Sequence, residues 1–456
     1  MTFLEISALL ITLSAAFGFI NFVYLKLPHT IGLVIMALMA SGVMVLADIL
    51  WPSLGIAATM GNALRKVDFA NTLMNGMLAF LLFAGAVHVN FTELAERKWA
   101  IGLMATLGVL VSTFITGAGI YYFGQWFCPR MPFVWALVFG ALISPTDPVA
   151  VLGLIKTIRI PRLLRAKIAG ESLFNDGVGV VVFTVMLTIA MSADPGWMDG
   201  AAHGAAAGHG AGGVGIGTIV KLFAGEAIGG AILGLVMGFA AYAAMKRIDE
   251  HNIEILITLA LVLSAYAIAL RIHVSGPIAM VVAGLLIGNH GARFAMSRNT
   301  RKHVFEFWTL LDEILNSVLF LLIGLEVLVI TWNRVNLPIA VYAIPLVLFA
   351  RLVSVAIPIN LLKVRDKFEE GTIAVLTWGG LRGGISVALA LALPENVYKP
   401  AILMATYAVV VFSIIVQGLT MKRLVLRYSF HGAGQEPKDD EEERDKTKKK
   451  KTGKKS

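Results

Sequence analysis

Six consecutive residues place two carboxylates, a hydroxyl and an amide inside an otherwise apolar stretch of the chain. They are Glu171-Ser172-Leu173-Phe174-Asn175-Asp176. On an ideal helix the four polar side chains fall within about 140 degrees of one another, so they can line one pocket. A carboxylate at bilayer depth is costly, by about 2.5–3.5 kcal/mol on insertion scales, and usually marks an ion pathway. An oxygen-rich pocket without His or Cys suits a small alkali cation or a proton rather than zinc or copper.

A second source of oxygen ligands is predicted where two prolines bracket a Thr-Asp pair, in Ser144-Pro145-Thr146-Asp147-Pro148. Proline removes a backbone donor and ends a helix, so we expect a break within this apolar stretch. The carbonyls freed near Thr146, the Thr146 hydroxyl and the carboxylates would together bind a small alkali cation. Asp147 is given a supporting role, and its architectural alternative is to cap the end of a half-helix.

A second break is predicted at Trp378-Gly379-Gly380-Leu381-Arg382-Gly383-Gly384, where four glycines surround a buried arginine. Paired broken helices at corresponding places in two halves of a transporter indicate an inverted repeat with the ion site between them. We therefore predict an inverted repeat that relates the two halves of the membrane part. Arg382 is the lone basic residue of this break, and we expect it to balance the charge of Glu171.

Asp176 is the residue predicted to bind both the cation and the proton. A carboxylate in a poorly hydrated cavity is costly when charged, so a proton can neutralise it or a cation can compensate it. If only the two loaded forms can cross a hydrophobic barrier, the protein must exchange one ion for the other. The alternative is that Asp176 is satisfied by neighbouring amides and has an architectural role only.

The elements that must position these residues are membrane helices. The chain has 456 residues, 57% of them hydrophobic and 15% charged, with a mean hydropathy of +0.79. Soluble domains are far less apolar, and stretches of about 20 apolar residues indicate a helical bundle rather than a barrel. Thirteen spans are predicted, at 3–23, 28–50, 72–91, 100–125, 133–155, 167–191, 217–244, 253–271, 274–290, 304–332, 337–361, 371–392 and 401–421.

The distribution of Lys and Arg predicts the orientation of these spans. Loops after odd-numbered spans carry the excess, for example within 156–167 and 293–302. Because cytoplasmic loops are enriched in Lys and Arg, the N-terminus is expected outside and the C-terminus in the cytoplasm. The Gly- and Ala-rich loop 192–217 is interpreted as an external linker between the two halves. Residues 1–422 are predicted to form the transmembrane domain and 423–456 a disordered, charged cytoplasmic tail.

Composition also excludes several functions. A single cysteine, Cys128, allows no intramolecular disulfide and no thiol metal site. The net charge of +9 fits cytoplasmic loop lysines and arginines, and there is no basic globular domain to bind nucleic acid. No nucleotide or haem motif occurs in a suitable context, so no cofactor is expected. Other charged or polar residues near or within spans are interpreted as ion-pair or hydrogen-bond partners: Asp312, Glu313, Asn316, Ser317, Glu326 and Arg351.

Three motifs in one order and spacing resemble the monovalent cation/proton antiporter family, in its sodium/proton exchanger branch. They are Ser144-Pro145-Thr146-Asp147-Pro148-Val149, Gly170-Glu171-Ser172-Leu173-Phe174-Asn175-Asp176-Gly177 and Trp378-Gly379-Gly380-Leu381-Arg382-Gly383-Gly384. The resemblance covers Met1 to about Lys422. It implies a homodimer of thirteen-span protomers, each with a dimerisation domain and a core domain in which two unwound helices cross. The core would move like an elevator, and the short tail implies a bacterial inner-membrane protein.

The resemblance also assigns roles to individual residues. Asp176 would be the shared cation and proton carrier, and the residues implied as sodium ligands, directly or through water, are Asp176, Glu171, Ser172 and Thr146. Asn175 and Arg382 match positions that support the site. An Asn-Asp pair, rather than two aspartates, is the form associated in the family with electroneutral one-for-one exchange of sodium, and also lithium, for protons.

Three other functions stay open at this stage. A potassium/proton antiporter could use the same scaffold, because the side chains do not define the size of the cavity. An ion channel could use the same polar broken helices, although paired half-helices and a single carrier carboxylate favour alternating access. An intramembrane enzyme with Asp147 and Asp176 as a carboxylate dyad would need an opening for a substrate, and Asn175 and Arg382 do not support it. We therefore expect a secondary transporter, with sodium, protons and membrane lipid as its partners.

Overall fold

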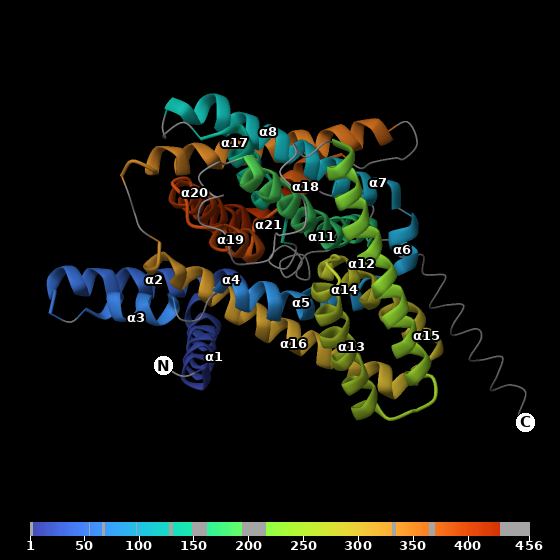
Figure 1. Cartoon of the computed structure of the whole chain (residues 1–456). Helices are drawn as coiled ribbons and strands as arrows, with labels where there is room; N and C mark the ends of the chain where they lie inside the picture. The colour runs from blue at the N-terminus through green and yellow to red at the C-terminus, as the bar shows by residue number, and fades with distance from the viewer. Residues whose placement is uncertain are drawn as a thin grey trace, which may run out of the picture.

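A computed structural model of the chain describes residues 3–53, 55–65, 69–96, 98–126, 131–147, 162–193, 216–330, 334–363 and 370–428. These ranges are helical without any strand (Figure 1). The first half contains α1 Phe3–Ile20, η1 Asn21–Leu25, α2 His29–Leu50, α3 Ile56–Arg65, α4 Phe69–Thr72, η2 Leu73–Met77, α5 Leu78–Val87, α6 Phe91–Glu96, α7 Lys98–Leu103, η3 Met104–Gly108, α8 Val109–Phe123, η4 Gly124–Trp126, α9 Phe133–Ile143 and α11 Arg162–Ala193.

The second half contains α12 Ile216–Met245, α13 His251–Arg271, α14 Gly276–Leu285, η6 Leu286–Gly291, α15 Ala292–Phe294, α16 Arg298–Leu325, η7 Glu326–Leu328, α17 Leu337–Leu362, α18 Thr372–Trp378, α19 Gly384–Leu391, α20 Lys399–Phe412, η8 Ser413–Gln417 and α21 Gly418–Arg427. Pro148, most of the loop 192–217 and the tail from residue 429 lie outside the described residues. The predictions made for them are therefore not addressed by the structure.

Eight of the described helical segments are long and apolar enough to cross a membrane. They are Leu4–Leu25, His29–Leu50, Lys98–Phe123, Lys167–Ala193, Ala224–Met245, His251–Arg271, Leu337–Leu362 and Lys399–Arg427. Two shorter apolar helices are Leu78–Val87 and Phe133–Ile143. The prediction of an all-helical protein with many membrane spans is confirmed, while the count of thirteen, the inverted repeat and the sidedness of the termini stay predictions.

One described helix ends and another is interrupted where prolines and glycines predict it. Helix α9 ends at Ile143, and Ser144–Asp147, here called the first interruption, has no helical structure. Helix α18 ends at Trp378 and α19 begins at Gly384, which leaves Gly379–Gly383 as the second interruption. The backbone N–H of Asp147 donates to the carbonyl of Leu381 at 2.8 Å. The two interruptions therefore touch, although they are far apart in the sequence.

Helix α11 lies in the middle of the molecule (Figure 1). Its polar segment contacts the first interruption through Ser172 and Thr146. The helix packs against α9 and η3 and also against α14. Buried apolar side chains form two hydrophobic clusters, one that includes Trp135 and Phe320 and one that includes Phe83 and Trp308. Because Phe320 and Trp308 both belong to α16, this helix contributes to both clusters. The polar site described next is enclosed by this apolar packing.

Candidate cation-binding site

Helix α11 continues without a break through the polar segment, as its predicted helical face requires. The four polar side chains are buried, with exposed fractions between 1% and 6%: Glu171, Ser172, Asn175 and Asp176. Asn175 donates from Nδ2 to Oε1 of Glu171 at 3.1 Å, one turn earlier on the helix. Buried polar groups at this density need partners from other elements, and those partners define the site.

The first partner is Thr146 in the first interruption. The hydroxyl of Ser172 donates to the Thr146 carbonyl at 2.5 Å, and the two hydroxyl oxygens lie 2.9 Å apart. Because the single Ser172 hydrogen points to the carbonyl, the Thr146 hydroxyl donates to Ser172 Oγ. Asn175 Nδ2 lies 3.3 Å from Thr146 Oγ1. The structure therefore brings Thr146, Ser172 and Asn175 together, as the sequence predicts.

The charge of Glu171 is balanced by Arg351, not by Arg382. Arg351 of α17 donates from both terminal nitrogens to the two Glu171 carboxylate oxygens, at 2.6 and 2.7 Å. It also donates to the carbonyl of Leu376 at 3.1 Å. The prediction of a Glu171–Arg382 pair is wrong, because the Arg351 side chain reaches Glu171 from α17 while the guanidinium of Arg382 donates to backbone carbonyls of Ser144 and Pro145. Arg351 is confirmed as an ion-pair partner, and a lone arginine in an apolar span was the signal for it.

Arg382 instead binds the backbone of the first interruption. Its Nη1 donates to the carbonyl of Ser144 and, at 2.9 Å, to that of Pro145. These carbonyls lack helical partners because the helix ends there. The sequence interpretation gave the freed carbonyls around Thr146 to the cation, whereas two of them already accept hydrogen bonds from a buried guanidinium. Arg382 thus supports the site by fixing its backbone.

Asp176 has an oxygen available for a ligand. Its Oδ1 is buried and has no hydrogen-bond partner among the described residues. Its charged neighbours are Asp147, Glu171 and Arg382. Arg351 pairs with Glu171, which leaves the carboxylates of Asp147 and Asp176 with the single guanidinium of Arg382, so one negative charge stays uncompensated in a poorly hydrated place. A cation or a proton on Asp176 would compensate that charge.

The glycines near the site allow close approach of the chain. A Cβ at Gly179 of α11 would clash with the Pro145 ring, and one at Gly383 would clash with Asp147 Oδ2. Real Cβ atoms do not tolerate such contacts, so glycine at both positions is what lets α11 and the second interruption close on the first. The geometry of Asp147 therefore depends on the absence of a side chain at Gly383.

Gly383→Ala is expected to displace Asp147, lower the ion exchange predicted from the sequence and destabilise the protein by about 1–3 kcal/mol, as overpacking does. The control is Gly42→Ala in α2, where an added Cβ would meet no described atom within 4 Å. Ion exchange in liposomes and thermal unfolding in detergent should separate the two variants. Equal behaviour of Gly383→Ala and Gly42→Ala would contradict the close approach.

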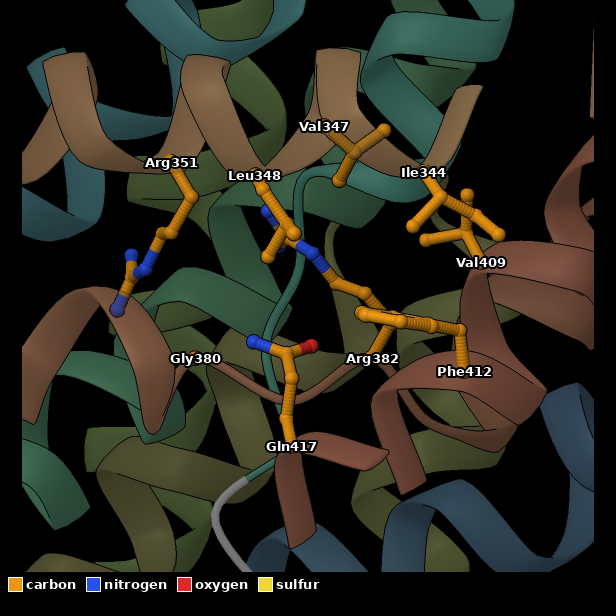
Figure 2. A pocket seen from close by; sticks show the side chains of 9 residues that line it. All are labelled: Ile344, Val347, Leu348, Arg351, Gly380, Arg382, Val409, Phe412 and Gln417. Atoms are coloured by element: carbon orange, nitrogen blue, oxygen red, sulfur yellow. The ribbon is translucent and has the colours of Figure 1, made fainter. Parts of the chain in front are cut away.

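A small cavity lies beside the two arginines (Figure 2). Its volume is about 10 Å³, room for roughly one water molecule, and its lining residues are Ile344, Val347, Leu348, Arg351, Gly380, Arg382, Val409, Phe412 and Gln417. The two arginine side chains extend in different directions, and Gln417 points its amide into the space (Figure 2). Gln417 carries no sequence signal, because a single glutamine in an apolar helix has no motif around it.

Known proteins resemble this chain over most of its length. Residues 8–427 match the family described as sodium/hydrogen exchanger, transmembrane. The Na⁺/H⁺ antiporter NhaP of Pseudomonas aeruginosa is 43% identical over 429 residues, which cover 93% of this chain and 96% of that protein. The Na⁺/H⁺ antiporter NhaH of Halobacillus dabanensis is 34% identical over 359 residues, 78% of this chain and 83% of the relative.

A solved structure shares the fold. The sodium proton antiporter MjNhaP1 from Methanocaldococcus jannaschii, at pH 8, superposes with a TM-score of 0.69 and covers 94% of this chain and 98% of its own. The identity between the two chains is 18%, so this likeness concerns the fold alone. The family resemblance predicted from the three motifs is confirmed by the sequence comparisons. Because the family match and the Pseudomonas aeruginosa relative each cover nearly the whole chain, the protein belongs to the sodium/hydrogen exchanger family.

Proposed function

We propose that this chain is a sodium/proton antiporter in which Asp176 binds sodium and the proton in turn. The observation that carries the proposal is the buried Asp176 Oδ1, which has no partner among the described residues and belongs to the turn of α11 after Ser172, whose hydroxyl meets that of Thr146. Oxygen ligands of this kind suit a small alkali cation. The relatives named as Na⁺/H⁺ antiporters support the choice of ions. The family consists of transporters, so no enzymatic reaction is proposed.

The proposed ligands would bind sodium either directly or through water. Asp176 would bind sodium directly, and Thr146 and Ser172 would offer hydroxyl oxygens directly or through water. Glu171 is engaged at both oxygens by Arg351, so its contribution would be to hold Asn175 through the Glu171 Oε1 that accepts from the Asn175 amide. Asn175, Asp147 and Arg382 would support the site.

Electroneutral exchange follows from the single carrier. A site with one carboxylate has the same net charge with one sodium ion as with one proton, so one-for-one exchange moves no net charge. Asn175 beside Asp176 is neutral and adds no second carrier. We therefore propose a 1:1 stoichiometry that does not respond to membrane voltage.

Alternating access is proposed to occur by movement of the core. The contact between the two interruptions supports a unit that carries the site as one body, because Asp147 and Leu381 are hydrogen-bonded at 2.8 Å. An elevator-type movement of this core against a dimerisation domain would expose Asp176 to each side in turn. The proposed protein is a homodimer in the bacterial inner membrane, with the N-terminus outside and the C-terminus in the cytoplasm.

The test is sodium-driven proton movement in proteoliposomes that contain a pH-sensitive dye. Addition of sodium should dissipate an imposed pH gradient, and the rate should be unchanged when valinomycin and potassium gradients set different voltages. Lithium should act as sodium does. Movement of protons by potassium alone would replace the proposal with a potassium/proton antiporter, and a voltage-driven current without exchange would indicate a channel.

A further inference from the structure

Three polar side chains near the end of the membrane part contact the second interruption or Trp378, the residue just before it. The backbone N–H of Arg382 donates to Ser413 Oγ at 2.9 Å. Gln417 donates from Nε2 to the carbonyl of Trp378 at 3.1 Å. The indole N–H of Trp378 donates to Thr420 Oγ1 at 2.9 Å. We call Ser413, Gln417 and Thr420 the polar row.

The polar row is built into one side of a helix. Its members are spaced by four and then three residues, which places them on one helical face. Ser413 and Gln417 begin and end the π-helical turn η8, and Thr420 follows in α21. Ser413 is fully buried and Gln417 is 3% exposed. The polar atoms of Ser413 and Gln417 thus face the protein interior, where Gln417 reaches the cavity beside Arg382 (Figure 2).

Two members of the polar row, Ser413 and Gln417, bind backbone groups that the interruption leaves free, and Thr420 binds the indole of Trp378. Trp378 is the last residue of α18, so its carbonyl has lost its helical partner, and the N–H of Arg382 precedes the start of α19. An unpaired backbone group inside a membrane protein is strongly unfavourable. The second interruption is rich in glycine and has few side chains of its own to satisfy these groups. Its conformation therefore depends on the polar row.

Two residues of the second interruption, Leu381 and Arg382, connect the polar row to the ion site. Leu381 accepts a hydrogen bond from the Asp147 N–H, and the Arg382 guanidinium donates to the carbonyls of Ser144 and Pro145. Ser413 of η8 binds the backbone N–H of Arg382. The side chain of Arg382 in turn binds the first interruption. A shift of this backbone would be transmitted to the carbonyls next to Thr146.

We propose that Ser413, Gln417 and Thr420 are positioning residues for ion exchange. They fix the second interruption so that Leu381 and Arg382 hold the first interruption in register with Asp176. This inference rests on the proposed function, since it names how the antiport site is kept in shape. None of the three residues touches the proposed cation ligands.

The experiment compares Ser413→Ala and Gln417→Met with Thr406→Ala in reconstituted full-length protein. Thr406 is a matched control because it is 1% exposed and its hydroxyl donates only to Ile402 of its own helix, at 2.8 Å. The sodium concentration for half-maximal exchange should rise about tenfold in both test variants, the effect of leaving one buried backbone group unpaired. The pH profile of exchange should also shift in both test variants. Thr406→Ala should match the wild type.

A conservative variant separates positioning from general damage. Ser413→Thr keeps a hydroxyl at the same place and should restore wild-type sodium dependence. If Ser413→Ala is not recovered as folded protein, Gln417→Met decides the matter. Unchanged sodium dependence and pH profile in the folded test variants, or an equal loss in Thr406→Ala, would overturn the positioning role alone. A wild type that exchanges no alkali cation would instead remove the proposed function and this inference with it.

Discussion

Asp176→Asn is expected to reduce sodium/proton exchange to the level of protein-free liposomes. Asparagine has nearly the same shape, so the hydrogen bonds of the surrounding hydroxyls should survive. It can neither bind a proton at neutral pH nor compensate the charge of a cation. The loss should therefore appear in transport and not in folding. Dye-monitored exchange and thermal unfolding, measured on the same preparation, test both parts.

A second measurement checks that one group serves both ions. Sodium added to weakly buffered wild-type protein in detergent should release protons, because both compete for Asp176. Asp176→Asn should release none. The matched control is Asp312→Asn, which changes a half-buried carboxylate that accepts from Asn316 at 3.0 Å within α16. Full exchange in Asp176→Asn, or equal losses in the two variants, would show that the carrier is another residue.

Arg351→Met is expected to destabilise the protein by about 3–5 kcal/mol, because it leaves Glu171 charged and buried without its partner. The pair is shielded from water, with side-chain exposures of 6% for Arg351 and 2% for Glu171. Exchange should fall as well, since the carboxylate that accepts from Asn175 would no longer be held. Thermal unfolding in detergent and exchange in liposomes measure the two effects.

The double variant Arg351→Met with Glu171→Gln should recover much of the stability lost by Arg351→Met. Removing both charges takes away the uncompensated one, and such double changes are often close to neutral. Lys399→Met is the control, because its ion pair with Glu395 is 2.8 Å long but Glu395 is 89% exposed. An exposed pair contributes only about 0–1 kcal/mol. If Arg351→Met were no more destabilising than Lys399→Met, the buried pair would not have the importance assigned to it.

Local rules explain what could be predicted near Asp176. The side chains of Glu171 and Asn175 lie one turn apart, so the period of the helix alone puts them in contact. Pro145 ends a helix because it lacks an N–H, and the glycines from Gly379 onward do so because they have no side chains. These effects depend on neighbours within about four residues, which the sequence displays directly.

Such local rules could not predict the partners of the charged groups. Two arginines, Arg351 and Arg382, were both within apolar stretches, and composition does not distinguish which of them would meet Glu171. The decision depends on how α17 and the second interruption are oriented against α11, which is fixed by the packing of many side chains. The hydrogen bonds from Arg382 to the carbonyls of the first interruption depend on the same packing.

The sequence by itself determined that this is a helical membrane protein with a polar, carboxylate-bearing face at Glu171–Asp176, two helix interruptions and membership of an exchanger family. Hydropathy, helical period and the backbone chemistry of proline and glycine are properties of short segments. Only the tertiary structure decided that Arg351 neutralises Glu171, that Arg382 binds backbone carbonyls and that Ser413 and Gln417 hold the second interruption. Contacts between distant segments depend on the three-dimensional packing of whole helices, and no short stretch of sequence contains that information.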